Sequence, residues 1–176
     1  MKHVYVFLLV LLTACTARAQ MKDSTDQRFH DDLLDHLVGS WHDSSVSHGS
    51  NFTSEVDARW VLNHQYLLIH LKSNEIIPWW GVQMEYYQYI GYNRNKQRYT
   101  VHGMSIEGDA DGSEGFCYGY RKGNIFKTIA KFSTDTSVVQ YLIWQPVTRD
   151  WRVQSRPLIK GKEGDVFLDM KLTKAD

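Results

Sequence analysis

The chain has 176 residues, and its 20 basic and 20 acidic side chains give a formal net charge of zero. This balance argues against a nucleic-acid partner, because such proteins concentrate positive charge on one face. Aromatic residues make up 13% of the sequence and prolines number only three, which excludes a disordered or collagen-like chain.

The N-terminal segment has the layout of a secretory signal peptide. A lysine, an apolar run over residues 4–12 and a stretch of small residues follow one another, as in cleavable signals. Two cleavage sites stay open: "LTAC" resembles a lipobox and would make Cys15 a lipidated first residue, whereas "ARA" before Gln20 fits ordinary cleavage. Residues 1–20 are therefore expected to direct the protein to the bacterial cell envelope or outside the cell, with membrane anchoring through Cys15 in the first case.

A single domain over residues 29–176 is expected to follow a polar tether at 21–28. Its first element is a predicted short helix that ends at Gly39, because apolar residues recur there at three- and four-residue spacing between acidic ones. These apolar residues are Phe29, Leu33, Leu34, Leu37 and Val38. Cys117 is the only cysteine after Cys15, so the sequence predicts a core that holds the fold without an intramolecular disulfide.

After the helix, the chain reads as a succession of strands. Segments rich in β-branched and aromatic residues alternate with turn residues, which is typical of an antiparallel sheet. Strands are predicted over 39–47, 53–62, 65–72, 82–93, 98–104, 115–121, 124–132, 138–146, 150–158 and 165–173. Short connections carrying Gly, Asn or Asp should join consecutive strands as hairpins. Because closure removes exposed edges, the expected fold is all-β: an antiparallel up-and-down barrel of about eight to ten strands with a short N-terminal helix.

The order of these elements resembles the calycin superfamily, which includes the lipocalins. It is most similar to bacterial secreted proteins and lipoproteins with a calycin-like barrel, and the likeness spans most of the mature chain. The matching positions are Leu37, Gly39 and Trp41, then Arg59, Val61, Leu62, Tyr66 and Leu67, then Gly91, Tyr92 and Tyr99.

This resemblance implies structural roles for a few residues. In calycins, a tryptophan after a Gly-x pair plugs the closed end of the barrel, and an arginine from a late strand lies across it. Gly39 and Trp41 would take these positions here, with Arg152 or Arg156 as the arginine. An indole buried in this way contributes on the order of a few kcal/mol, and a stacked guanidinium roughly 0.5 to 2 more.

Two groups of residues are candidates for a ligand site. The adjacent Trp79 and Trp80 precede a strand and are expected near the barrel mouth, either as a lid or packed against barrel and helix. Five polar or aromatic residues on the strands would anchor a ligand or carry acid–base chemistry if they face inward. They are Arg59, Glu85, Tyr87, Tyr89 and His102. The sequence does not fix the strand register, so an outward, hydrated position stays open for them.

No metal, cofactor or nucleophile motif is recognised. The histidine spacing does not match a zinc signature, and the glycine in "GDADGSEG" at 108–115 is misplaced for an EF-hand. Haem-binding barrels of similar shape use a histidine near the C-terminus, and here none follows His102. Cys117 lies between two aromatic residues and is expected to be an inert core thiol. Neither a metal nor a cofactor is therefore expected.

The leading hypothesis is an exported barrel that binds a small apolar or amphipathic, lipid-like molecule, without catalysis. The residues expected to line its pocket are Trp79, Trp80, Tyr87, Tyr89, Arg59 and His102. One alternative is a structural or assembly lipoprotein whose barrel is filled with side chains. Another is a barrel enzyme in which His102 and Glu85 act together in acid–base chemistry. An open pocket favours the first and third of these, and a packed interior favours the second.

Overall fold

The structure is a computed structural model that describes residues 28–78, 80–106, 108 and 115–176. The predicted signal peptide, Cys15, Trp79 and all but the last residue of the predicted tether lie outside the described residues.

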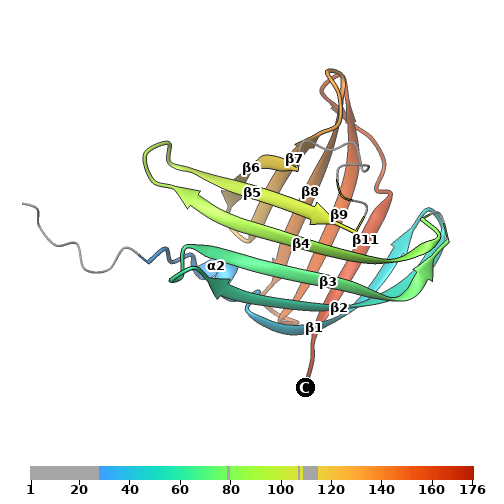
Figure 1. The fold of residues 1–176 in the computed structure, drawn as a ribbon, viewed down its shortest axis with the longest axis horizontal. Helices are drawn as coiled ribbons and strands as arrows, with labels where there is room; N and C mark the ends of the chain where they lie inside the picture. Colours follow the sequence, from blue (N-terminus) through green and yellow to red (C-terminus); the bar gives the residue numbers. More distant parts are fainter. Residues whose placement is uncertain (1–27, 79, 107, 109–114) are drawn as a thin grey trace, which may run out of the picture.

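In the described part of the chain, one short helix precedes eleven strands (Figure 1). The elements are α2 (Asp32–Asp35), β1 (Gly39–Ser47), β2 (Ser50–Val61), β3 (Tyr66–Ile77), β4 (Val82–Asn93), β5 (Arg98–Ser105), β6 (Phe116–Lys122), β7 (Ile125–Lys131), β8 (Thr136–Gln145), β9 (Asp150–Ile159), β10 (Lys162–Glu163) and β11 (Leu168–Lys174). Within these residues, no helix has both the length and the apolar character needed to cross a membrane.

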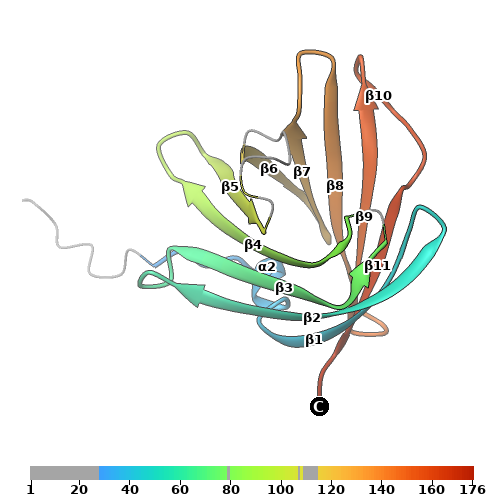
Figure 2. The ribbon, with the colours of Figure 1, turned by 45° about the vertical axis from the view of Figure 1, so that its right-hand side comes forward.

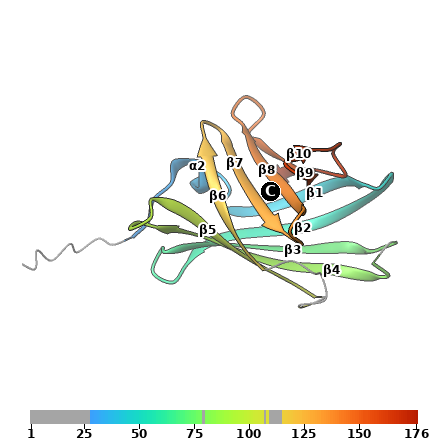
Figure 3. The same ribbon diagram turned by 90° about the horizontal axis from the view of Figure 1, so that it is seen from above.

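The strands form a closed antiparallel barrel, as predicted. Each strand from β1 to β9 is hydrogen-bonded to the next, and β11 lies between β9 and β1 and so completes the ring. The two-residue β10 adds to the edge of β9 and stands in a stretch that was expected to be a turn. Seen from above, β6–β8 run steeply across the direction of β2–β4, as a strongly twisted closed sheet requires (Figure 3).

The first hairpin is tighter than the sequence suggested. β2 begins at Ser50, three residues before its predicted start, because Ser47 pairs directly with Ser50. The two residues between them, His48 and Gly49, both have positive φ angles, of 48° and 76°. A two-residue turn of this kind matches the twist of its flanking strands, so both strands extend up to it.

One half of the barrel interior is a packed apolar core. Trp41, Phe126 and Trp151 are almost fully buried there, and the leucines of the helical segment, at positions 33, 34 and 37, pack onto them. Gly119 makes room for this packing, since a Cβ at that position would lie 2.3 Å from Cζ of Phe126. The helix thus closes one end of the barrel, and Figure 2 shows it behind β3 and β4.

Trp41 packs at the end of the barrel that the helix closes. Its indole Nε1 donates a 2.7 Å hydrogen bond to the carbonyl of Leu37, which ties β1 to the helical segment. The cation over the ring is Lys174, whose Nζ lies 4.5 Å from the ring centroid and donates to the carbonyl of Val38. Gly39 allows this approach, because a Cβ there would lie 2.2 Å from the same Nζ.

The expectation that Arg152 or Arg156 lies over the ring of Trp41 is wrong. Lys174 is directly opposite Trp41 in the β1–β11 pairing, so its stem lies on the same face. Arg152 and Arg156 instead occupy positions of β9 that alternate to the outer face. There Arg152 binds Asp169, and Arg156 donates to the carbonyl of Gly164. The strand register, not the residue type, decides which cation reaches the indole.

Replacing Lys174 with methionine is expected to lower the free energy of unfolding by about 1 kcal/mol, because the cation–π contact and one hydrogen bond are lost while the aliphatic stem remains. Lys122→Met is the matched control, because Lys122 is a lysine with an exposed side chain on β6. Its replacement should change the free energy of unfolding by at most about 0.5 kcal/mol. Urea unfolding followed by tryptophan fluorescence measures both; equal losses would contradict the special role of Lys174.

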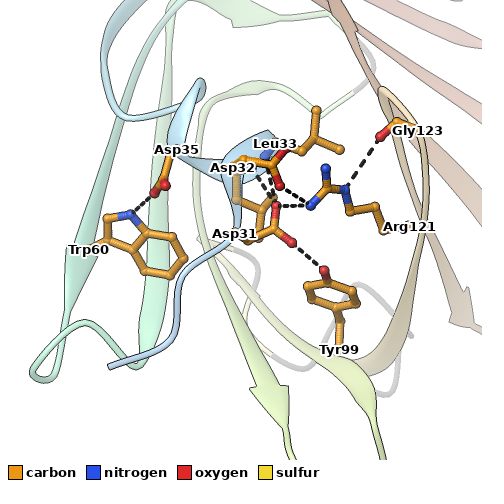
Figure 4. A network of polar contacts seen from close by, with 9 residues as sticks. Asp31, Asp32, Leu33, Asp35, Trp60, Tyr99, Arg121 and Gly123 are labelled. Carbon is orange, nitrogen blue, oxygen red and sulfur yellow. Dashed lines mark hydrogen bonds and ion pairs between the residues drawn. The ribbon is translucent and has the colours of Figure 1, made fainter. Parts of the chain in front are cut away.

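A polar network fastens the helix to the barrel wall (Figure 4). The carboxylate of Asp31 caps the helix by accepting from the amides of Leu33 and Leu34, each at 3.0 Å. It also accepts from the Tyr99 hydroxyl on β5 and from Nη1 of Arg121 on β6. Burial and the bond to Asp31 raise the pKa of Tyr99 above its usual range, which keeps the phenol protonated as a donor.

Two further contacts complete this attachment. Nη1 of Arg121 also donates to Asp32 at 2.6 Å, and the pair raises the pKa of the guanidinium. On the other side of the helix, the indole of Trp60 on β2 donates to Asp35 at 2.8 Å. The helix is therefore held from three strands, although four residues are far too few for a helix to be stable alone.

Candidate functional site

A cavity of about 380 Å³ occupies the barrel interior at the end opposite the helix. We call it the outer chamber. Its walls come from the strand ends farthest from α2, and its main apolar lining residues are Phe52, Leu71, Ile77, Trp80, Met84 and Met170. Polar groups, among them Ser47 and His48 at the β1–β2 turn, contribute to its rim. The outer chamber is thus an apolar cup with a polar rim.

A second cavity of about 180 Å³, the inner chamber, adjoins the first. Both chambers are lined by Tyr86, Phe132 and Gln140. On β4 and β5 the inner chamber lies nearer the closed end than the outer one: it is lined by Gln88 beyond Tyr86 and by Gly103 beyond Ser105. The two chambers are therefore stacked along the barrel, with the smaller one deeper.

The polar side chains that line the inner chamber are neutral, and they stand among apolar ones such as Val101, Phe132 and Val138. Gln88 and Thr128 are buried, and Nε2 of Gln88 donates to the Tyr86 hydroxyl at 3.3 Å. Burial raises the pKa of the Cys117 thiol to about 11, so this group is also neutral at physiological pH. Among the described residues that line this chamber, none is Asp, Glu, Lys, Arg or His. Its chemistry is that of amides, hydroxyls and a thiol.

Asp43 is an interior acid that the sequence analysis missed. It lies on β1 between Trp41 and Ser45, opposite Ser54 of β2, and is 3% exposed. Ser45 Oγ donates to Oδ2 of Asp43, whereas Oδ1 and the hydroxyl of Ser54 have no hydrogen-bond partner in the described structure. Burial raises the pKa of Asp43 to about 6. The acid borders neither chamber but adds negative charge to the interior.

A sequence signal for this acid exists. Once Trp41 is assigned to the inner face, alternation assigns Asp43, Ser45 and Ser47 to the same face. These four residues are buried, as the pattern requires. The same alternation gives Met84, Tyr86 and Gln88 as the inner face of β4, and all three line the chambers.

The predicted ligand residues are distributed over both faces of the barrel wall. Trp80 lines the outer chamber and is 39% exposed. Because Gln88 faces inward opposite Ile69, its neighbours Tyr87 and Tyr89 face outward. Arg59 is likewise exposed and pairs with Asp57 on the surface at 2.9 Å. The strand register therefore places Arg59, Tyr87 and Tyr89 on the outer face of the barrel, and the expectation that they line its interior is wrong.

The acid–base pair expected of the enzyme alternative does not form. Glu85 accepts from His70 at 2.8 Å and from Tyr87 at 3.1 Å, on the outer face of β3 and β4. These hydrogen bonds hold the pKa of Glu85 below its usual value, which makes it a weaker base. His102 packs edge-on against Phe116 instead, at 4.4 Å between ring centroids. Glu85 and His102 thus have separate partners, both outside the barrel.

Among the described residues, no group of three or more His, Cys, Asp or Glu side chains is arranged so that it could hold a metal ion.

Larger hollows, of about 950 and 980 Å³, lie on the outer surface. Some of their charged groups bind one another: Arg152 with Asp169 at 2.5 Å, and Lys171 with Asp150 at 3.4 Å. Because these hollows are open to solvent, a ligand there would lose less of its contact with water than a ligand in the interior. The two stacked chambers are the better candidate site.

The fold, a closed antiparallel barrel of ten strands, is compatible with a calycin-like architecture. No protein-family model matches the chain, and no curated protein matches it, so the site is defined by its own geometry.

Proposed function

We propose that this chain is an exported barrel that binds a small apolar or amphipathic molecule in its two interior chambers. The observation that carries the proposal is an apolar cup of about 380 Å³ inside an otherwise well-packed barrel. Cavities of roughly 300 to 1,000 Å³ with mostly apolar walls and a few polar groups are typical of small-molecule sites. Apolar surface that a ligand removes from water contributes about 25 cal/mol per Å².

The division of the interior supports binding over a purely structural role. A structural barrel filled with side chains accounts for the closed half, where Trp41, Phe126 and Trp151 are buried. It leaves the open half unexplained, where rings and thioethers surround a hollow and Trp80 borders it from the loop before β4. Protein interiors are close-packed, so a hollow of this size needs a reason.

Export is supported by the N-terminal sequence alone. The charged, apolar and small-residue regions of residues 1–20 follow the order of a signal peptide, with Cys15 as the candidate lipidation site. A binding barrel in the cell envelope would meet amphipathic molecules there.

The proposed binding is tested with N-phenyl-1-naphthylamine, a neutral probe whose fluorescence rises in apolar surroundings. Met84→Trp fills the outer chamber and is expected to weaken probe binding about tenfold or more. Met104→Trp is the matched control, because Met104 lies on the neighbouring strand but is 53% exposed on the outer face. Fluorescence titration of both variants and the parent chain gives the three Kd values.

Circular dichroism of Met84→Trp confirms that the barrel is intact before the Kd is interpreted. Equal affinity of Met84→Trp and Met104→Trp for the probe contradicts binding in the outer chamber. A folded parent chain with no saturable fluorescence change contradicts the proposed function itself.

A further inference from the structure

The inner chamber brings neutral hydrogen-bonding groups from four strands to one place. The amide of Gln88 comes from β4, the thiol of Cys117 from β6, the hydroxyl of Thr128 from β7 and the amide of Gln140 from β8. A primary amide has two N–H donors and one acceptor oxygen, and Gln88 uses one donor on the Tyr86 hydroxyl. Such groups can both donate to and accept from a ligand.

A charged ligand group would be unfavourable at this depth. Transfer of an ion into a buried site without a counter-charge costs several kcal/mol, and no acidic or basic side chain lines the inner chamber among the described residues. A hydroxyl or carbonyl avoids this cost, since its hydrogen bonds to water are replaced by bonds to amides and hydroxyls.

The outer chamber has the opposite character. Phe52, Leu71 and Met170 give it an apolar wall, and its polar groups are concentrated at the rim and where it meets the inner chamber. An apolar body therefore fits between the mouth and the polar floor.

From this division we infer that the ligand is an uncharged amphiphile, bound with its hydroxyl or carbonyl end in the inner chamber and its apolar body in the outer chamber. The inference rests on the proposed function and adds the charge of the ligand and its orientation.

Three probes with the same ten-carbon tail test the charge. 1-Decanol, decanoate and decylammonium compete with N-phenyl-1-naphthylamine for the parent chain at neutral pH. Decanol is expected to displace the dye at a roughly tenfold or more lower concentration than either ion. Displacement by decanoate at the same concentration as decanol overturns the inference, and so does equal displacement by decylammonium.

A pair of isosteric variants tests the orientation. Thr128→Val removes one hydroxyl from the inner chamber and is expected to weaken decanol binding roughly three- to tenfold while dye affinity stays within about twofold. Thr100→Val is the matched control, because Thr100 lies on β5 opposite Gly91, on the outward-facing side of the strand. Unchanged decanol affinity in Thr128→Val overturns the head-inward orientation.

These outcomes separate the two levels of the proposal. If the folded parent chain does not bind the dye at all, the ligand site itself is rejected. Dye binding without a preference for decanol keeps the site and rejects the neutral, head-inward ligand.

Discussion

Replacing Asp31 with alanine is expected to lower the free energy of unfolding by about 3 to 4 kcal/mol. The substitution removes the helix cap at the amides of Leu33 and Leu34, which alone contributes about 1 kcal/mol. It also leaves the Tyr99 hydroxyl and one Arg121 contact without their acceptor in a site where Asp31 is only 4% exposed. Unsatisfied buried donors cost about 1 to 3 kcal/mol each.

Asp32→Ala is the matched control, because Asp32 is the adjacent residue and binds the same guanidinium. Its side chain is 85% exposed, so its loss should lower the free energy of unfolding much less than the loss of Asp31. Urea unfolding monitored by tryptophan fluorescence gives both values. Similar losses in the two variants would show that the helix cap and the tyrosine bond contribute little.

The hydrogen bonds of Asp31 show which contacts can be predicted from the sequence and which cannot. The apolar spacing predicts a helix before Gly39, and a helix is found, though only over Asp32–Asp35. An aspartate just before the apolar run is a readable cap signal. Its other partners, Tyr99 and Arg121, are 68 and 90 residues away along the chain. Nothing local in the sequence could join them before the barrel topology is known.

The barrel itself was predictable because its information is local. Alternation and short polar turns determine strands and hairpins, and the need to cover edges then favours closure. Register is a different kind of information, since a slip of one residue turns every side chain to the other face. For this reason Tyr87 and His102 were open candidates for the interior and lie outside it, while Tyr86 and Gln88 line the chambers.

The chambers could not be predicted either. A cavity is the volume left over by all side chains together, and it depends on small choices such as Gly103, where a Cβ would lie 2.3 Å from the hydroxyl of Tyr86. The inner face of β1 was predictable in principle, since the position of Trp41 sets the alternation. It was overlooked because an acid and a row of serines do not look like core residues.

Asp43, the acid on that inner face, is the site of the second substitution with a large expected effect on stability. Asp43→Asn is expected to raise the free energy of unfolding by about 3 kcal/mol at pH 7.5. Folding raises the pKa of Asp43 from 3.8 to about 6, so the ionised acid lowers the stability of the folded parent chain by about that amount. Burial is the main cause, because the carboxylate must give up water and the hydrogen bond from Ser45 offsets only part of that loss. Asparagine keeps an acceptor for the Ser45 hydroxyl and carries no charge.

The sign of the pH dependence follows from which state binds the proton more tightly. The folded chain holds the proton on Asp43 up to about pH 6, whereas the unfolded chain releases it near pH 3.8. Below the lower value both states are protonated and the acid costs nothing. As the pH rises from about 4 to 6, the parent chain loses stability relative to Asp43→Asn, and above that range the difference is constant.

Urea unfolding of the parent chain and of Asp43→Asn between pH 4 and pH 7.5 measures this difference. Asp57→Asn is the control, since Asp57 lies on the adjacent strand in a surface ion pair with Arg59 and should change stability by no more than about 0.5 kcal/mol. A stability gain in Asp43→Asn that is the same at both ends of the pH range would mean that packing, and not the buried charge, is responsible. A gain that appears only as the pH rises identifies the carboxylate as an unfavourable charge retained inside the barrel.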